Sequence, residues 1–245
     1  MSHTMTIEPL HDVEYPESDG EPMAETDVHR DEMLALIDAL KWRFRKEPDV
    51  YVAGNNFVYY EEGTPKAVFS PDVYVVRGVP KGQRRTFKLW QERHAPCFVM
   101  ELSSRKTWLE DIGNKKALCQ HLGIAEYFLY DPEGDVVKPP LQGFRLEAGR
   151  YEPIAPDTDG HLASAALGII FRLDEALRLH ARDASTGELL LRPEEVRARA
   201  EDESTARRRA EEQLEREADA RRQAEAERDA LAARLRDLEG SPRDE

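Results

Sequence analysis

The sequence predicts a mixed α/β or α+β domain followed by a long charged helix, and three observations support this. The chain has 245 residues, 40% of them hydrophobic, enough for a packed core. Segments of helical and strand periodicity alternate in the order α-β-β-β-α-β, which indicates a mixed central sheet flanked by helices. After Pro193 the composition becomes rich in Ala, Glu and Arg, with neither Gly nor Pro before Gly240, which is typical of one long helix.

The N-terminal segment, residues 1–22, combines acidic residues with Pro and Gly and lacks apolar periodicity. It is therefore expected to be a flexible acidic arm. A helix is predicted from about Asp27, a plausible N-cap, to Lys46. Its buried stripe repeats at three-to-four spacing and consists of Met33, Leu36, Ile37, Leu40 and Phe44.

The remaining elements follow from alternating apolar runs and their boundaries. Strands are expected at residues 50–60, 67–76, 96–104 and 125–131, with weaker candidates at 143–154 and 168–173. A second helix is predicted over residues 108–122, ending before Gly123, a typical residue just past a helix end. Together, residues 23–192 are expected to form one domain.

Residues 193–245 are expected to form the charged helix. A heptad frame along it has an apolar seam only near its end, at Leu231, Leu235 and Leu238. Two interpretations remain open: a solvated helix stabilised by ion pairs along most of its length, or a short coiled coil near the C-terminus.

The formal net charge is −14, which at face value argues against a nucleic-acid partner. The excess acid, however, lies in the N-terminal arm and the C-terminal helix, while residues 31–193 are nearly neutral. Cys97 and Cys119 make neither a disulfide framework nor a zinc ligand set. With no signal peptide and no apolar run of membrane-spanning length, a cytoplasmic protein without membrane contact is expected.

Two carboxylates interrupt the predicted strands. Asp72 opens the run Val-Tyr-Val-Val, and Glu101 lies between Met100 and Leu102. Strand alternation puts Glu101 on the same face as Val99 and Ser103. A buried carboxylate requires a cation, an ion pair or a metal, although either residue could instead face solvent or form a structural ion pair.

A lysine on the following helix strengthens the functional interpretation. Helical projection puts Lys115 in the middle of the apolar stripe and Lys116 near its edge; the stripe contains Trp108, Ile112, Leu118, Cys119 and Leu122. A lysine there must serve an acidic site or extend to solvent. Two carboxylates and a lysine predict a site for phosphodiester hydrolysis, in which Asp72 and Glu101 hold Mg²⁺ and Lys115 orients water or stabilises developing charge.

The segments SPDVYVV and PCFVMELSSRKTWLEDIGNKKALCQHLGIAEYFLYDPEGD resemble the Uma-type restriction endonucleases, a bacterial branch of the PD-(D/E)XK nuclease superfamily. The resemblance covers nearly the whole chain from about Tyr15. Pro71-Asp72 matches the PD element and Glu101 the acidic member of (D/E)XK, but Ser103 stands where the lysine is expected. The resemblance puts that lysine on the next helix, at Lys115 of the Asp-x-Gly-x-Lys segment.

This resemblance implies a restriction-endonuclease-like core and Mg²⁺-dependent cleavage of DNA, with Mn²⁺ as a substitute. The expected substrate is double-stranded DNA, and cutting of both strands by one active site per chain calls for a homodimer. A further acidic ligand from the first helix would be Glu25 or Glu32. His29 lies on the stripe of that helix and is either an accessory site residue or a core histidine, and Ser103 is a further accessory candidate.

Residues 77–93 form a basic connection with interleaved Phe87 and Trp90, between the two strands that carry Asp72 and Glu101. This segment is either a DNA-contacting surface or a solvated loop. Arg105 and Lys106, just past Glu101, either contact phosphate or cap the strand end. The candidate DNA contacts are Arg84, Arg85, Lys88, Arg105 and Lys106.

Two alternatives to a DNA endonuclease remain. One is a catalytically silent nuclease fold that binds nucleic acid or a partner and assembles through its C-terminal helix. The other is a metal-dependent hydrolase of a different phosphate ester. Cleavage of plasmid DNA that requires metal and is lost on substitution of Asp72 distinguishes the DNA endonuclease from these two alternatives.

Overall fold

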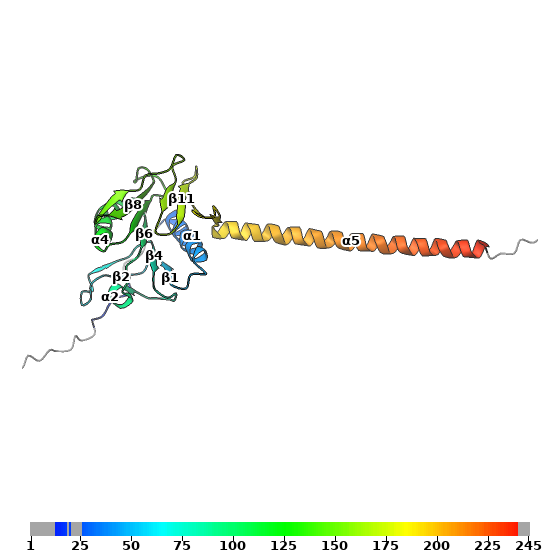
Figure 1. Ribbon diagram of the computed structural model, residues 1–245, viewed down its shortest axis with the longest axis horizontal. Coiled ribbons are helices and arrows are strands. Elements are labelled where there is room, and N and C mark those ends of the chain that lie inside the picture. Colours follow the sequence, from blue (N-terminus) through cyan, green and yellow to red (C-terminus); the bar gives the residue numbers. More distant parts are fainter. Residues whose placement is uncertain (1–12, 19, 21–25, 240–245) are drawn as a thin grey trace, which may run out of the picture. The chain divides into compact units, whose positions relative to one another are not determined.

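The computed structural model describes residues 13–18, 20 and 26–239. The chain divides into two compact units, one up to Pro193 and one from Glu194 onward, and each is considered by itself. Every strand that the structure describes lies in the first unit (Figure 1).

A six-stranded sheet is the centre of the first unit. Its strand order is β1 (Val50–Ala53), β4 (Val73–Arg77), β6 (Phe98–Leu102), β7 (Glu126–Tyr130), β8 (Leu141–Glu147), β9 (Arg150–Pro153). β6 and β7 are parallel, and the other neighbouring pairs are antiparallel. The predicted mixed central sheet is therefore confirmed.

Two smaller sheets complete the unit. One consists of β3 (Val68–Phe69), β2 (Val58–Tyr59) and β5 (Phe87–Lys88), with the short helix α2 (Leu89–Glu92) after β5. The other consists of β10 (Leu162–Ser164), β11 (Ile169–Leu173), β12 (Leu179–Asp183) and β13 (Leu189–Leu190). The expected strand 50–60 is split into β1 and β2, and 67–76 into β3 and β4. Strands of two or three residues are too short to show alternation, which is why the sequence did not reveal β5, β10 and β13.

Helix α1 (Asp27–Arg43) starts and ends slightly differently from the expected helix. Thr26, not Asp27, is the N-cap, and its hydroxyl accepts from the backbone N–H of His29 at 3.2 Å. At the other end, the Lys81 ammonium donates to the carbonyls of Phe44 and Arg45 at 2.6 and 2.9 Å. Since these contacts satisfy the last carbonyls, the helix stops before Lys46.

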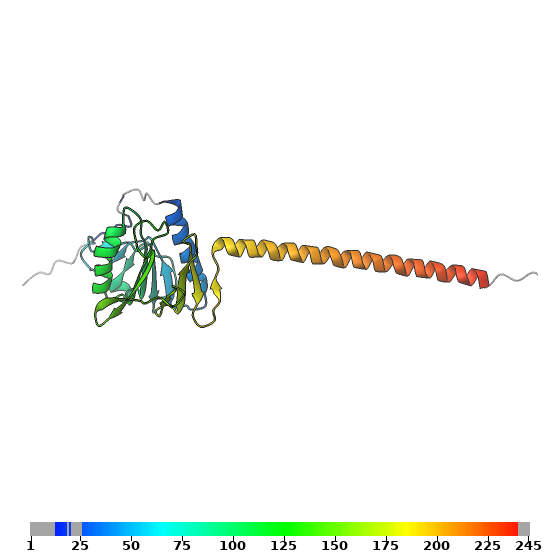
Figure 2. The same cartoon turned by 90° about the horizontal axis from the view of Figure 1, so that it is seen from above.

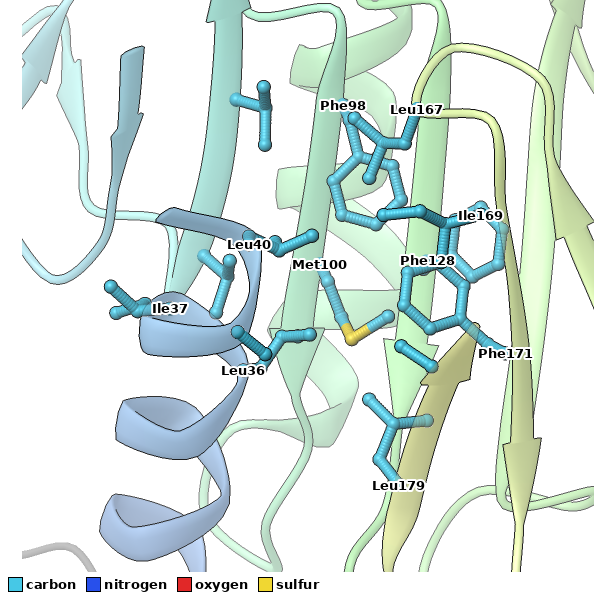
Figure 3. Packing of buried hydrophobic residues seen from close by; sticks show 14 of the residues in the cluster. Leu36, Ile37, Leu40, Phe98, Met100, Phe128, Leu167, Ile169, Phe171 and Leu179 are labelled. Atoms are coloured by element: carbon cyan, nitrogen blue, oxygen red, sulfur yellow. The ribbon is translucent and has the colours of Figure 1, made fainter. Parts of the chain in front are cut away.

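The central sheet is buried on both faces. Figure 2 shows α1 in blue and the segment containing α4 in green on opposite sides of the strands. On the α1 side, Leu36 and Leu40 pack toward Met100, while Phe98, Phe128 and Phe171 form an aromatic cluster (Figure 3). The opposite cluster contains Tyr74, Val99, Cys119 and Tyr127, among others. Neighbouring residues of β6 thus alternate between the two cores, as predicted.

The crossover from β6 to β7 contains an irregular helix. It consists of α3 (Trp108–Glu110), the π-helix η1 (Asp111–Lys115) and α4 (Lys116–His121). A regular helical projection puts Ile112 on the buried stripe, but Ile112 is 40% exposed and Asp111 only 1%. A π turn is wound more loosely than an α turn, so it rotates Ile112 out of the stripe and Asp111 into it.

Part of the predicted acidic arm packs on the domain. Tyr15 lies 4.9 Å from the ring of Tyr59 and 5.2 Å from that of Trp90, centre to centre. The Tyr59 hydroxyl donates to the Pro16 carbonyl at 2.5 Å. At Tyr15 and Pro16 the arm therefore makes specific contacts with the domain.

The second unit contains α5 (Pro193–Glu239) from Glu194 onward, and this helix of 47 residues confirms the predicted long charged helix. Its described side chains are almost all exposed. Ion pairs at i,i+4 spacing join Arg199 to Glu203, Arg207 to Glu211 and Arg221 to Glu225. Such pairs support the helix between Arg199 and Glu225, where its side chains are solvated. None of the helices in the described ranges is long and apolar enough to cross a membrane.

Candidate active site

Asp72 and Glu101 are cross-strand neighbours. The antiparallel register pairs Val73 with Met100, so the next position along puts Asp72 opposite Glu101. The backbone N–H of Asp72 lies 3.4 Å from Glu101 Oε2, and Leu102 N donates to Asp72 Oδ2 at 2.7 Å. The two predicted carboxylates are therefore brought together where the central strands meet.

Glu101 is completely buried. Its Oε2 accepts from Lys115 Nζ at 2.9 Å, while Oε1 has no hydrogen-bond partner in the described part of the chain. Burial raises the pKa of the Glu101 carboxyl well above its ordinary value, and the Lys115 charge offsets this only in part. The nearby carboxylates of Asp72 and Asp111 raise it further.

Lys115 lies between two carboxylates, as its position on the predicted stripe suggested. Its ammonium is 2.9 Å from Glu101 Oε2 and 3.2 Å from Asp111 Oδ1, and the side chain is 16% exposed. Burial by itself lowers the pKa of Lys115, but the surrounding carboxylates outweigh it and raise that pKa above its ordinary value. Lys115 therefore stays protonated at neutral pH.

Asp111 is a site carboxylate that was not among the predicted site residues. It is 1% exposed, and neither carboxylate oxygen makes a hydrogen bond of good geometry to a described residue. Burial raises the pKa of the Asp111 carboxyl. The i,i+4 spacing to Lys115 was a usable signal, but the π turn that directs Asp111 inward cannot be read from local periodicity.

The charges at this site suit a divalent cation. Asp72, Glu101 and Asp111 surround one ammonium, so ionised carboxylates leave two negative charges in excess. Glu101 Oε1 is unpartnered among the described residues, and Asp72 Oδ1 faces His29 Nε2 at 3.7 Å. Hard carboxylate oxygens are the ligands that Mg²⁺ and Mn²⁺ prefer. The donor set thus fits the predicted metal.

The accessory candidates have different surroundings. His29 is 5% exposed and lies beside Asp72, so it belongs to the site. Glu32 does not reach the site: both its oxygens accept from Arg192, at 2.7 and 2.9 Å, and Tyr130 also donates to it. Ser103 is buried, and its hydroxyl has no hydrogen-bond partner in the described structure. Glu25 lies outside the described residues.

Two of the candidate DNA contacts are packed against the protein. Arg84 is 12% exposed, pairs with Glu92 at 2.6 Å and lies 4.3 Å over the Tyr51 ring. The Glu92 carboxylate raises the pKa of the Arg84 guanidinium. The Lys88 ammonium lies 4.3 Å over the ring of Tyr15.

The other three candidates have exposed side chains. Arg85 pairs with Glu17 at 3.0 Å and remains 84% exposed. Arg105 pairs with Asp135 at 2.7 Å and is 77% exposed, and Lys106 beside it is also exposed. Of the basic residues predicted to contact DNA, these three are accessible to a ligand from solvent.

A second group of possible metal ligands lies in the turn between β9 and β10. Ligand atoms of Asp157, Asp159 and His161 lie within 4.8 Å of one another. Asp157 is already hydrogen-bonded within the turn, since it accepts from the backbone N–H groups of Asp159 and His161 at 3.0 and 2.8 Å. These bonds lower the pKa of the Asp157 carboxyl and account for the cluster as a turn motif.

Comparison with known proteins gives one family match. The family described as "Uma2: Putative restriction endonuclease" matches residues 2–176. A solved structure with a similar arrangement is a putative nuclease belonging to DUF820 from Anabaena variabilis ATCC 29413, at 13% sequence identity and a TM-score of 0.43. That likeness covers 60% of this chain and 76% of the other. No curated protein matches the chain significantly.

Proposed function

Because the chain belongs to the Uma2 family of restriction endonucleases, we propose that it is a metal-dependent endonuclease that hydrolyses phosphodiester bonds of double-stranded DNA. The observation that carries this proposal is the surplus of buried negative charge around Lys115. The Lys115 ammonium pairs with Glu101 and Asp111, and Asp72 lies beside Glu101. Glu101 keeps an oxygen without a hydrogen-bond partner among the described residues. Such an arrangement is costly unless a cation is bound.

Each residue has a defined task in the proposed reaction. Asp72 and Glu101 would hold the divalent cation, Mg²⁺ or Mn²⁺, through carboxylate oxygens other than those that accept from Leu102 and Lys115. When bound, this ion activates water and neutralises charge on the scissile phosphate. Lys115 donates to Glu101 and places a positive charge where negative charge develops on phosphate oxygens. Asp111 positions Lys115 from its other side.

The residues around this centre have supporting tasks. His29 lies next to Asp72 and orients its carboxylate. Arg105 and Lys106 lie a few residues past the end of β6 and bind DNA phosphates near the reacting bond. Cleavage of both strands by one site per chain calls for a homodimer.

Plasmid cleavage tests the proposal. Supercoiled plasmid is incubated with the wild-type chain over a titration of Mg²⁺, and with Mn²⁺ in a parallel series. Nicked or linear product that needs the metal and disappears in Asp72→Asn and Glu101→Gln is expected. Both substitutions are isosteric, so a thermal melt should show that the variants remain folded.

A matched control uses the other acidic cluster. The double variant Asp157→Asn/Asp159→Asn removes the same kind of charge from the turn between β9 and β10. It should cleave as the wild type does. Cleavage that survives in Asp72→Asn, or wild-type protein that never cuts with either metal, would contradict the proposed function.

A further inference from the structure

An open groove of about 980 Å³ runs along β1, the edge strand of the central sheet. Its walls are the C-terminal half of α1, the strand itself and the loop 81–85. None of the proposed catalytic residues lines it. Its volume is at the upper end of the range that accommodates a whole ligand.

The groove is strongly basic in an acidic protein. Its charged lining residues are one acid, Asp38, and the five bases Lys41, Arg45, Lys81, Arg84 and Arg85. The side chains of Lys41 and Arg85 are exposed. The whole chain, by contrast, carries a formal charge of −14. A positive lining on a negative protein favours an anionic ligand.

Two buried hydrogen-bond donors in the groove have no acceptor among the described residues: Asn56 Nδ2 and Arg84 Nη1. The Tyr74 hydroxyl donates to Asn56 Oδ1 at 2.9 Å, which fixes the amide with its nitrogen unpaired. The Glu92 carboxylate accepts from Nε and Nη2 of Arg84, so Nη1 of this guanidinium lacks an acceptor among the described residues. Because an unpaired donor is costly, the Asn56 amide suits a ligand that supplies an acceptor oxygen, while the Arg84 guanidinium packs over the Tyr51 ring.

The groove approaches the proposed active site at Gly54. This glycine lines the groove, and a Cβ added to it would lie 1.9 Å from the backbone carbonyl oxygen of Asp72. The backbone N–H of Asn55 donates to the Pro71 carbonyl at 2.8 Å. The end of β1 is therefore in direct contact with the Pro71-Asp72 segment.

We propose that this groove binds a nucleic-acid strand and guides it to Asp72; the inference rests on the proposed nuclease function. Lys41 and Arg85 bind phosphates of the strand, while the Asn56 amide donates to one of its oxygens. An acidic peptide has similar charge, but the contact between Gly54 and Asp72 favours the substrate of the adjacent nuclease site.

Binding without cleavage tests the proposal. The full chain in EDTA is titrated into short fluorescein-labelled oligonucleotides, single- and double-stranded, and anisotropy is followed over a range of salt concentrations. Asn56→Asp keeps the acceptor for Tyr74 but replaces the free donor with a negative charge, so affinity should fall about tenfold or more. In Lys41→Ala/Arg85→Ala, the slope of log K against log salt should fall by about 0.7 per lost contact on single strands and about 0.9 on duplex.

The matched control is Arg150→Ala, which removes one exposed cation from β9, at the opposite edge of the same sheet. It should bind as the wild type does, and all variants should melt within a few degrees of it. The groove proposal would be wrong if Asn56→Asp bound the oligonucleotides with unchanged affinity, or if Arg150→Ala lost as much affinity as the groove variants. It would also be wrong if a labelled Glu-rich peptide bound more tightly than either oligonucleotide.

Plasmid cleavage, measured in parallel, separates this proposal from the proposed function. If the wild-type chain cleaves plasmid but the groove variants bind the oligonucleotides as tightly as the wild type, the groove proposal is rejected and the proposed function stands. Groove variants that lose binding, together with a wild type that never cleaves, reject catalysis and support the groove as a nucleic-acid site.

Discussion

Tyr127 donates its hydroxyl to the backbone carbonyl oxygen of Asp111 at 2.7 Å. Tyr127 lies on β7, directly beside the strand that carries Glu101, and Asp111 begins the π-helix that carries Lys115. A π turn is rare and loosely wound, and such turns occur frequently at functional sites. This buried hydrogen bond joins the sheet to the turn that directs both Asp111 and Lys115 inward.

Tyr127→Phe should therefore weaken both stability and catalysis. The Asp111 carbonyl loses its buried donor, at a cost of about 1–3 kcal/mol in the free energy of unfolding. Urea denaturation measures that cost, and plasmid cleavage should show a lower kcat. Tyr151→Phe is the control, because its hydroxyl donates to the Ile124 carbonyl at 2.9 Å, away from the site. If both variants lowered kcat equally, Tyr127 would have no special role.

Lys115→Gln should be strongly destabilised and nearly inactive. It leaves Glu101 and Asp111 buried without their cation, which costs about 3–5 kcal/mol in EDTA. Loss of charge stabilisation in the transition state should lower kcat by roughly 10²–10³. The neighbouring Lys116, whose ammonium lies 3.2 Å over the Phe144 ring, provides the control. Lys116→Gln should lose little of either property, and a loss as large as that of Lys115→Gln would argue against the assignment.

Glu101→Gln should raise stability in EDTA at neutral pH, by about 1 kcal/mol, while abolishing cleavage. The pKa of Glu101 is raised in the folded protein, so its contribution to stability is present below the unfolded pKa of about 4.3 and is lost as pH rises through the folded value. The advantage of the variant should therefore grow with pH in thermal melts.

Glu126 provides a control for which the opposite change in stability is expected. It is also a buried glutamate, but Arg145 and the backbone N–H of Ala165 bind its Oε1 at 3.0 and 2.9 Å, and Ser164 donates to its Oε2. Glu126→Gln should lower the melting temperature. A lower melting temperature in Glu101→Gln as well would show that Glu101 is well compensated without a metal.

Gly54→Ala should impair the site through the backbone. The added methyl would lie 1.9 Å from the Asp72 carbonyl oxygen and 2.8 Å from Ile37 Cδ1, so the Asp72 segment must move. Overpacking of this kind costs about 1–3 kcal/mol, and cleavage should fall along with stability. Gly113→Ala, where a Cβ meets nothing within 4 Å, is the control for stability. Wild-type cleavage in Gly54→Ala would show that Asp72 tolerates displacement.

Self-association through α5 is the last prediction. Leu231 is 60% exposed within one chain and belongs to the heptad seam that continues at Leu235 and Leu238. Leu231→Asp/Leu235→Asp should convert a homodimer to a monomer in sedimentation equilibrium. Leu189→Asp, an exposed leucine of the first unit, should leave the mass unchanged. A wild type that sediments as a monomer would contradict the coiled coil.

The amino-acid sequence by itself predicted the main helices and the central strands, and it singled out the three residues proposed for the centre of the site. Asp72 and Glu101 stand out because a carboxylate interrupts a period-two apolar run, and Lys115 because it interrupts a helical stripe. These signals are local, so they can be read from neighbouring positions. The long charged helix was predictable for the same reason.

Only the tertiary structure decided which polar groups meet. Glu32 was a candidate metal ligand until its partner Arg192, 160 residues away, was seen to bind both its oxygens. Arg84 was a candidate DNA contact, but Glu92 and Tyr51 hold it against the domain. Asp111 turns inward because a π turn held by Tyr127 changes the helical phase. In each case the free energy of the polar side chain depends on a partner that the fold brings near. Local periodicity carries no information about that partner.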